Sequence, residues 1–280
     1  MAGVVVTGSS GLVGSAMAAT LQAAGWAVRG VDRVAGRWTN VVGDLRDPQV
    51  REAALRSSDV VVHTAALHAP HVGRVDDSEF HDVNVAATEA LLRDGERVGI
   101  RRFIYVSSTS VYGHALVPTD QAVWVDEDLT PQPRDIYDIT KLAAERLVAS
   151  SALASLTLRI ARCFPEPLPV LAVHLLHRAV GLADVAAATA QVLEHDAVTG
   201  VFNIAGPYPF TRADCPALHR DAAGLVAERL PEVATAFRER NWPLPPTLDR
   251  VYDSAAATAA FGYHPVHGIH RLLRVCGQGR

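Results

Sequence analysis

The strongest constraint on the fold is the glycine-rich segment 7–14, Thr-Gly-Ser-Ser-Gly-Leu-Val-Gly, which lies between the first predicted strand and the first predicted helix. In this segment Gly8 allows a tight turn, Gly11 lets the backbone approach a pyrophosphate, and the last glycine allows close packing of the helix. Free N–H groups at the helix start attract an anion. We therefore expect dinucleotide binding by Gly8, Ser10, Gly11 and Leu12, with an ordinary glycine turn as the alternative.

The first half of the chain alternates β-branched runs with alanine- and leucine-rich stretches, a pattern typical of parallel strands joined by helices. Strands are predicted at 4–7, 27–32, 41–43, 60–63, 102–107 and 157–160, and helices at 12–24, 48–56, 79–97 and 137–150. Near-continuous apolar strands indicate a sheet that is covered on both faces. Residues 1–162 are therefore predicted to form an α/β, doubly wound parallel sheet of the Rossmann type.

Beyond residue 160 this alternation weakens and proline becomes frequent. The sequence still predicts one strand at 201–204 and helices at 183–194, 216–229 and 254–261. We expect residues 163–280 to form a small, irregular substrate-binding lobe that is interleaved with the end of the sheet.

An acidic residue, Asp32, ends the second predicted strand, eighteen residues after the last loop glycine. A carboxylate here accepts hydrogen bonds from the ribose hydroxyls of adenosine and repels a 2′-phosphate, which favours NAD over NADP as the cofactor. Arg33 moderates that repulsion, so NADP stays open as the less favoured alternative. Asp44 and Leu45 are predicted to contact the adenine, with capping of the helix that starts at Pro48 as the alternative for this acidic segment.

Tyr137 and Lys141 lie four residues apart on a predicted helix, so both side chains can point into one cleft. Lys141 is the only lysine among 26 basic residues. A nearby ammonium and a positive nicotinamide ring would lower the pKa of a phenol from about 10 toward a value useful for proton transfer. Ser108, at the carboxyl end of the fifth strand, would hold the substrate oxygen. A solvated helix face is the alternative explanation of the tyrosine–lysine pair.

The overall composition disfavours several classes of partner. The formal net charge is -4 with scattered arginines, whereas a nucleic-acid binder carries a basic surface. The most apolar windows are too short or too interrupted to span a membrane, and no secretory signal is recognised, so a cytoplasmic protein is expected. The three cysteines, Cys163, Cys215 and Cys276, indicate neither a disulfide framework nor a zinc site, and no metal is predicted.

Several motifs in a fixed order resemble those of the extended short-chain dehydrogenase/reductases, the NAD-dependent sugar epimerases and dehydratases. The resemblance covers nearly the entire chain and rests on segments 7–14, 32, 44–45, 62–66, 84–85, 106–113, 137–141 with 145, 158–159, 183–186, 202–204 and 261–265. It implies a catalytic triad of Ser108, Tyr137 and Lys141, and that Ala65 and Ala66 line the cofactor. It also implies that Asn84 supports the site, with bonding to its local backbone as the alternative.

Family members often pair through two long helices, and this resemblance implies a homodimer formed through the helices predicted at 79–97 and 137–150. Two departures from the family pattern bear on the reaction. Family dehydratases carry an Asp-Glu pair after the catalytic hydroxyl residue; here Thr109 and Ser110 take these places, so dehydration is not expected.

The second departure concerns the region that binds a nucleotide in family members. Arg162 replaces a family asparagine, and only eighteen residues separate Pro165 from Asp184, where relatives carry a longer segment. This shortened region is similar to that of the uronate dehydrogenases, which oxidise free sugar acids. The arginine that those enzymes use for the carboxylate has no clear match here, since its place falls near Leu171.

The side chains predicted to contact the substrate are His68, Thr109, Ser110 and Arg162. His71 and Arg74 share the loop of His68, for which simple solvation is the alternative. The guanidinium fork of Arg162 suits a carboxylate or phosphate, with an ion pair to Glu166 as the alternative.

The sequence thus predicts an enzyme that moves a hydride between NAD and a carbinol or ketone carbon of a small-molecule substrate, a sugar or nucleotide-activated sugar. Tyr137 would be the general acid or base, Lys141 would lower its pKa, and Ser108 would orient the reacting oxygen. An epimerase and a net dehydrogenase or ketoreductase of a small substrate such as a sugar acid both stay open. A dinucleotide sensor without turnover is the alternative from another class.

Overall fold

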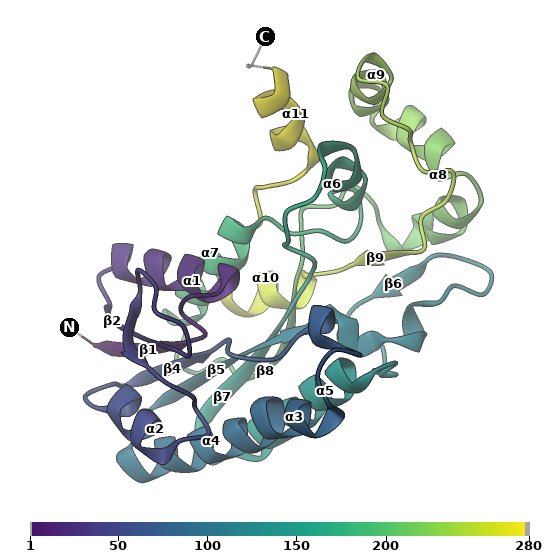
Figure 1. The fold of residues 1–280 in the computed structure, drawn as a ribbon. Coiled ribbons are helices and arrows are strands. Elements are labelled where there is room, and N and C mark those ends of the chain that lie inside the picture. Colours follow the sequence, from purple (N-terminus) through teal and green to yellow (C-terminus); the bar gives the residue numbers. More distant parts are fainter. Residues whose placement is uncertain (1, 278–280) are drawn as a thin grey trace.

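The structure, a computed structural model, describes residues 2–277. Within this range a parallel sheet of seven strands runs in the order β3-β2-β1-β4-β5-β7-β8 (Figure 1). The strands are β1 (Gly3–Thr7), β2 (Ala27–Asp32), β3 (Thr39–Val42), β4 (Val60–His63), β5 (Arg102–Ser108), β7 (Ala154–Ile160) and β8 (Gly200–Ile204). The strand order reverses between β1 and β4, and open sheets of this kind bind ligands at such a point, beyond the carboxyl ends of the strands.

Helices cover both faces of the sheet, which confirms the predicted doubly wound α/β fold (Figure 1). One face carries α2 (Pro48–Leu55), α4 (Ala87–Val98) and α5 (Ile136–Ser150), and the other carries α1 (Leu12–Ala23), α7 (Leu182–Val192) and α10 (Ala255–Phe261). Alternate strand residues supply the two cores: Val5 and Phe103 face the first set of helices, while Val4 and Ile104 face the second. The apolar strands are thus buried on both sides.

The helix predicted at 79–97 is present, but it is not uniform. The chain instead forms α3 (Asp77–His81), a π-helical turn at Asp82–Ala86, and then α4. The wider π turn changes the direction of the side chains within it, and such turns are common at functional sites. Here the turn contains Asn84, whose side chain is directed at the backbone of Leu67 rather than at its own helix.

The second half of the chain adds elements that the sequence pattern did not reveal. The strands β6 (Val123–Val125) and β9 (Arg250–Tyr252) pair in parallel, and the helices α6 (Leu168–His174), α9 (Pro231–Glu239) and α11 (Ile269–Gly277) accompany the expected α8 (Cys215–Arg229). Strands of three residues are too short to give a period of two. Helices α6, α8 and α9 share a separate apolar core. In the part of the chain that is described, no helix is long and apolar enough to cross a membrane.

Candidate active site

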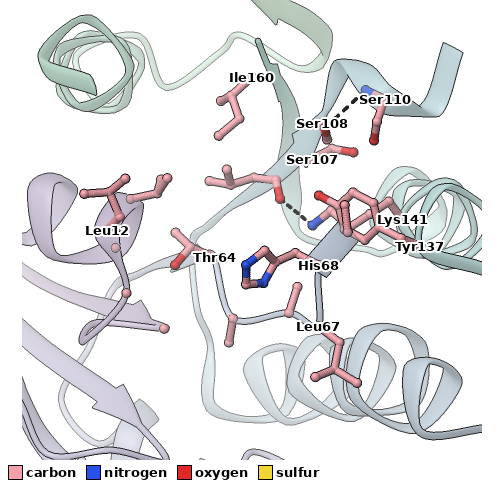
Figure 2. A pocket seen from close by; sticks show the side chains of 18 of the residues that line it. Leu12, Thr64, Leu67, His68, Ser107, Ser108, Ser110, Tyr137, Lys141 and Ile160 are labelled. Atoms are coloured by element: carbon pink, nitrogen blue, oxygen red, sulfur yellow. Dashed lines mark hydrogen bonds between the residues drawn. The ribbon is translucent and has the colours of Figure 1, made fainter. Parts of the chain in front are cut away.

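A cavity of about 540 Å³ follows the carboxyl ends of the strands, from the loop after β1 to the segment after β7. Figure 2 shows Leu12 at one side, Tyr137 and Lys141 at the other, and His68 between them. With the exception of Ser10, the predicted site residues all line this cavity: Gly8, Gly11, Leu12, Asp32, Arg33, Asp44, Leu45, Ala65, Ala66, His68, Ser108, Thr109, Ser110, Tyr137, Lys141 and Arg162. The structure therefore brings together groups that span most of the first 162 residues.

The glycine loop is shaped as the sequence predicts. Gly8 has a φ of +68°, and a Cβ there would stand 2.7 Å from the hydroxyl oxygen of Thr64. A Cβ at Gly14 would collide with the carbonyl of Gly8. Gly11 caps α1 without any side-chain acceptor, so the first N–H groups of this helix carry no side-chain partner. Such a loop, open to the cavity at a helix start, fits the diphosphate of a dinucleotide.

Asp32 is held firmly at the same end of the cavity. Its Oδ2 accepts a hydrogen bond from the Ser10 N–H at 3.0 Å, and its Oδ1 accepts one from the Val34 N–H at 3.1 Å. Each carboxylate oxygen keeps a lone pair for a further donor. This geometry fits the two hydroxyl groups of a ribose.

Ser10 does not line the cavity, and its contact with the cofactor stays a prediction. The Ser10 hydroxyl donates to the carbonyl of Val34 at 2.6 Å and lies 2.7 Å from the hydroxyl of Thr39. Ser10 is therefore turned away from the cavity and acts on Asp32 through its backbone N–H.

The two acidic residues Asp44 and Asp47, which follow β3, have different roles. Asp47 caps α2, because its carboxylate accepts from the Gln49 N–H at 2.8 Å. Asp44 lines the cavity and forms an ion pair with Arg46, whose Nη2 lies 2.8 Å from the carboxylate. The guanidinium of Arg46 is the largest cause that lowers the pKa of Asp44 below its usual value.

A buried chain of hydrogen bonds ties the cofactor loop to the middle of the cavity. The hydroxyl of Thr7 accepts from the backbone N–H groups of Thr64 and Ala65, so its proton is free to go to Nδ1 of His63 at 2.7 Å. Nε2 of His63 then donates to Thr88 at 2.9 Å, and Thr88 donates to the carbonyl of Asn84. Burial lowers the pKa of His63 to about 3, which keeps this imidazole neutral.

Asn84 completes this chain by fixing the cavity wall. Its Oδ1 accepts from the Leu67 N–H at 2.8 Å, and its Nδ2 donates to the Leu67 carbonyl at 2.9 Å and to the Thr140 hydroxyl at 3.1 Å. Asn84 thus joins the segment before His68 to α5. The alternative of a purely local role in its own helix is wrong.

Tyr137 and Ser108 both lie on the side of the cavity away from Leu12 (Figure 2). The oxygen of Ser108 accepts from the Ser110 N–H at 3.1 Å, so its own proton is available to a second oxygen. Burial raises the pKa of Tyr137 to about 12, and a hydrogen bond with Ser108 opposes that rise. The expected lowering of this pKa by Lys141 is therefore wrong for the protein by itself, because desolvation of the phenolate outweighs the favourable contacts.

Lys141 is almost entirely buried, with 3% of its surface exposed. Its Nζ donates to the carbonyl of Val106 at 2.6 Å and lies 4.2 Å from the ring centre of Tyr105. Burial lowers the pKa of Lys141 to about 7, whereas the nearby carboxylate of Glu145 acts in the opposite direction. The Lys141 side chain thus exchanges between ammonium and neutral amine near neutral pH.

A buried ion pair between Glu145 and Arg159 lies near Lys141. The carboxylate of Glu145 accepts from the Ser107 hydroxyl at 2.5 Å and from the Arg159 guanidinium at 2.7 Å. Arg159 also donates to the Tyr112 hydroxyl at 3.1 Å, which in turn donates to Asn203 at 2.9 Å. Every strong donor in this network has an acceptor, so the charges beneath the cavity are held in fixed places.

Of the side chains predicted to contact the substrate, the loop after β4 contributes one to the cavity wall. His68 lines the cavity and stacks against Phe164, with ring centres 6.3 Å apart. Burial and the neighbouring His71 lower the pKa of His68. His71 and Arg74 are not among the cavity-lining residues. His71 instead lies with its Nδ1 3.1 Å from the carbonyl of His68.

The segment after β7 supplies the far end of the cavity. Arg162 lines it and also pairs with Glu166, so both predicted contacts of this arginine are compatible with the geometry. Among the lining residues that sequence reasoning missed are Arg178, Arg250 and Tyr252. No local motif marks them, since they reach the cavity only through the pairing of distant segments. Within residues 2–277, no group of three or more His, Cys, Asp or Glu side chains is arranged to hold a metal ion.

The comparisons with known proteins agree with this geometry. The sequence model of the NAD-dependent epimerase/dehydratase family matches residues 4–165. A 3-beta-hydroxysteroid dehydrogenase from Mycolicibacterium neoaurum is 34% identical over 157 residues, which are 52% of this chain and 42% of that protein. A UDP-glucose 4-epimerase from Streptomyces lividans is 29% identical over 161 residues, which are 54% of this chain and 47% of that protein. The chain thus spans less than half the length of these curated relatives.

The fold extends this similarity through the whole chain. A short-chain dehydrogenase/reductase superfamily protein from Agrobacterium tumefaciens, solved with bound NAD, superposes with a TM-score of 0.72 at 22% identity, covering 99% of this chain and 96% of the other. At this level of identity the match speaks for the fold alone. The family match, however, contains the glycine loop, the acidic strand end, and the serine, tyrosine and lysine that converge on one cavity. The chain belongs to the NAD-dependent epimerase/dehydratase family.

Proposed function

We propose that this chain is an NAD-dependent oxidoreductase that moves a hydride between the nicotinamide and a carbinol or ketone carbon of a sugar-like small molecule. The observation that carries the proposal is the convergence of Ser108, Tyr137 and Lys141 on the cavity that also contains the glycine loop and Asp32. A proton-transfer group and a dinucleotide site in one cavity are the two parts that such a reaction needs.

When bound, NAD supplies the hydride acceptor or donor, and the protein manages the proton. In the reducing direction Tyr137 is suited to donate, because its raised pKa keeps the phenol protonated until a ketone oxygen gains charge. In the oxidising direction Tyr137 must accept a proton from the carbinol, which requires a cation beside it. Lys141 is the cation on the same helix, and Ser108 keeps a proton with which to orient the reacting oxygen.

Asp32 supports the assignment of NAD rather than NADP. Its carboxylate lines the cavity, is fixed by two backbone donors and retains acceptor capacity for ribose hydroxyls. A 2′-phosphate at this place would face the negative charge of Asp32. Arg33 is exposed beside Asp32 and lines the same end of the cavity. We therefore expect NADP to bind more weakly than NAD rather than not at all.

Dehydration is not part of the proposal. The two residues after Ser108 are Thr109, which is buried, and Ser110, and neither offers a carboxylate to remove a proton from carbon. The proposal therefore covers a net dehydrogenase or ketoreductase and an epimerase, which share the hydride step.

A second candidate substrate class follows from the 3-beta-hydroxysteroid dehydrogenase that shares 34% identity with this chain. A cyclic apolar alcohol would use the same hydride step and the same three side chains. The two classes make opposite demands on the far end of the cavity, because an apolar ring gains nothing from the three arginines found there.

Incubation of the protein with NAD and a panel of carbinols tests the proposal. The panel contains free sugars, sugar acids, nucleotide-linked sugars and a 3-beta-hydroxysteroid, and the readouts are reduced nicotinamide and the stereochemistry of the recovered substrate. We expect stoichiometric NADH with at least one member, or an epimer without net NADH. Tight NAD binding without either product from any member would contradict the proposal and favour a dinucleotide sensor.

A further inference from the structure

Three segments that are distant in sequence meet at the far end of the cavity. Arg162 follows β7 and forms a parallel bridge with Ala179, which brings the backbone of Arg178 alongside it: the Arg162 N–H donates to the Arg178 carbonyl at 3.3 Å. The strand β9 joins from a third direction, because His177 Nδ1 donates to the carbonyl of Arg250 at 2.8 Å. Arg162, Arg178 and Arg250 consequently line one end of the same cavity.

The charges at this end do not cancel. Arg162 pairs with Glu166, and Arg250 pairs with Asp249. Among the described residues, no carboxylate lies within 4.0 Å of the guanidinium of Arg178, which leaves three cationic groups against two anionic ones.

The neighbouring histidines do not change this charge balance. Burial lowers the pKa of His177 to about 3 and also lowers that of His174, so both rings are neutral at physiological pH. The excess positive charge is therefore a property of Arg178 and its two arginine neighbours.

Arg178 also has hydrogen-bonding capacity to spare. Its Nη2 donates to Nε2 of His174 at 2.6 Å, which orients the guanidinium from behind. In the described part of the chain, neither the buried Nε of Arg178 nor that of Arg250 has a hydrogen-bond acceptor. A buried donor without an acceptor is costly, and an anionic ligand in the cavity would remove that cost.

Two further observations agree with an anionic ligand. Burial lowers the pKa of Arg178 and the nearby carboxylate of Asp249 opposes this, while the positive charges of Arg250 and Arg162 lower the pKa further, so an added negative charge would relieve the repulsion among the arginines. Ser108 is paired in the sheet with Ile160, two residues before Arg162. With about 3.3 Å per residue along the strand and about 4.8 Å between strands, this places the arginine backbone about 8 Å from the residue predicted to hold the reacting oxygen, a distance that one small substrate can span.

We propose that Arg178, flanked by Arg162 and Arg250, forms an anion-binding subsite that selects a small substrate with a carboxylate or phosphate group close to the reacting carbinol. The proposal deepens the proposed function and rests on it for the position of the reacting carbon. The anion would accept from the Arg178 guanidinium donors that have no partner among the described residues, Nε included, while Nη2 donates to His174.

The first test measures anion binding without turnover. The unfolding midpoint of the full-length protein is recorded against inorganic phosphate, with sodium chloride at equal ionic strength as reference and saturating NADH to cover the glycine loop. We expect the apparent dissociation constant for phosphate to weaken about 10- to 100-fold in Arg178→Gln, the loss typical of one charge-assisted contact. Arg238→Gln, an exposed arginine on α9, is the matched control and should behave as wild type. Equal phosphate affinity in wild type and Arg178→Gln would overturn the proposal.

The second test separates the two sources of the anion. Glucose, glucuronate and glucose 6-phosphate share a ring and differ only at one carbon, so calorimetric titration of each into the NADH-bound protein isolates the charged group. We expect one of the two acids to bind at least about tenfold more tightly than glucose, and the better acid identifies carboxylate or phosphate. No preference for either acid over glucose would also overturn the proposal.

A variant that keeps the positive charge serves as a control in case Arg178→Gln does not fold. Arg178→Lys retains the cation but loses the two-point fork, so it should bind the preferred acid with an affinity between those of wild type and Arg178→Gln. If Arg178→Gln fails to fold, an affinity of Arg178→Lys equal to that of wild type contradicts the proposal. Because these are binding measurements, they can succeed even if Tyr137 proves dispensable for hydride transfer, and they can fail even if it is essential.

Discussion

The cofactor end and the substrate end of the cavity are built in different ways. At the cofactor end, the loop 8–14 and the tips of β1, β2 and β4 are joined by hydrogen bonds among backbone groups, hydroxyls and the neutral His63. At the substrate end, the segments 160–166, 174–180 and 249–252 are joined around arginines, and two buried guanidinium nitrogens lack acceptors within the described chain.

This difference indicates where the specificity of the enzyme resides. The cofactor end is internally satisfied and offers mainly open helix N–H groups and one fixed carboxylate, Asp32. The substrate end carries unbalanced positive charge, and in our proposal the ligand brings the opposite charge. Lys141 lies where the two ends meet. Asn84 fixes the part of the cavity wall between them through its hydrogen bonds to the backbone of Leu67. The predictions below test this division, in order of decreasing expected effect.

The largest effect among these is expected at the junction. In Lys141→Met the side chain keeps its length but loses the ammonium next to Tyr137, so kcat should fall about 100-fold, in the range typical of lost general acid–base assistance. Lys141→Arg should fail similarly, because a planar guanidinium does not fit between the Tyr105 ring and the Val106 carbonyl. Initial-rate kinetics at saturating NAD measures this, with circular dichroism as the folding control. A Lys141→Arg enzyme with wild-type kcat would remove the need for a compact ammonium.

The next prediction concerns the cofactor end alone. Asp32→Asn removes the charge that favours ribose hydroxyls and repels a 2′-phosphate, so the ratio of the NADPH to the NADH dissociation constant should fall about 10- to 100-fold. Fluorescence titration of both reduced cofactors gives the ratio. Asp44→Asn serves as control, since Asp44 is already paired with Arg46. An unchanged ratio would show that Asp32 does not set the cofactor preference.

Asn84 tests the wall between the two ends. Asn84→Ala leaves both backbone groups of Leu67 without their partner, so the free energy of unfolding should fall by about 2 kcal/mol and KM should rise several-fold while kcat changes less. Thr140→Val removes one of the three hydrogen bonds of the Asn84 side chain and should show a smaller loss. Urea unfolding and steady-state kinetics provide both numbers. A fall in kcat equal to that of Lys141→Met would mean that Asn84 does more than position this wall.

The last prediction, the smallest in its effect on activity, concerns the pH dependence of stability. The pKa of Lys141 is lowered from 10.5 to about 7 in the folded protein, so between these values the unfolded chain binds more protons than the native one. The contribution of Lys141 to the free energy of unfolding therefore rises as pH increases from about 7 toward 10, and it does not change with pH below about 6. The unfolding free energy of wild type minus that of Lys141→Met should accordingly increase between about pH 6 and pH 9.5. A difference that is independent of pH would contradict the burial of a titrating lysine.

The sequence predicted the cofactor end well because its information is local. The glycine spacing, the acid at the end of β2 and the Tyr137–Lys141 spacing each lie within one strand–helix unit, and strand ends of a parallel sheet meet at one edge. The seven-stranded sheet was predicted for the same reason, since long apolar runs reveal buried parallel strands.

The substrate end could not be predicted because it depends on contacts between distant segments. Arg178 and Arg250 carry no motif, and they meet Arg162 only through a single bridge and a strand of three residues. The π-helical turn that directs Asn84 at Leu67 also lacks a sequence signal. The direction of the Tyr137 pKa was wrong because its desolvation depends on the packing around it, which spacing alone does not reveal.

The most direct test of the account is a single-turnover comparison of wild type and Tyr137→Phe with NAD and the best carbinol of the panel. The account predicts that the rate of NADH formation, or of epimer formation, falls about 1000-fold while the dissociation constant of NADH stays within about twofold, because only the proton-transferring oxygen is removed. A Tyr137→Phe protein that forms product at the wild-type rate would contradict the role of Tyr137 at the meeting point of the two ends.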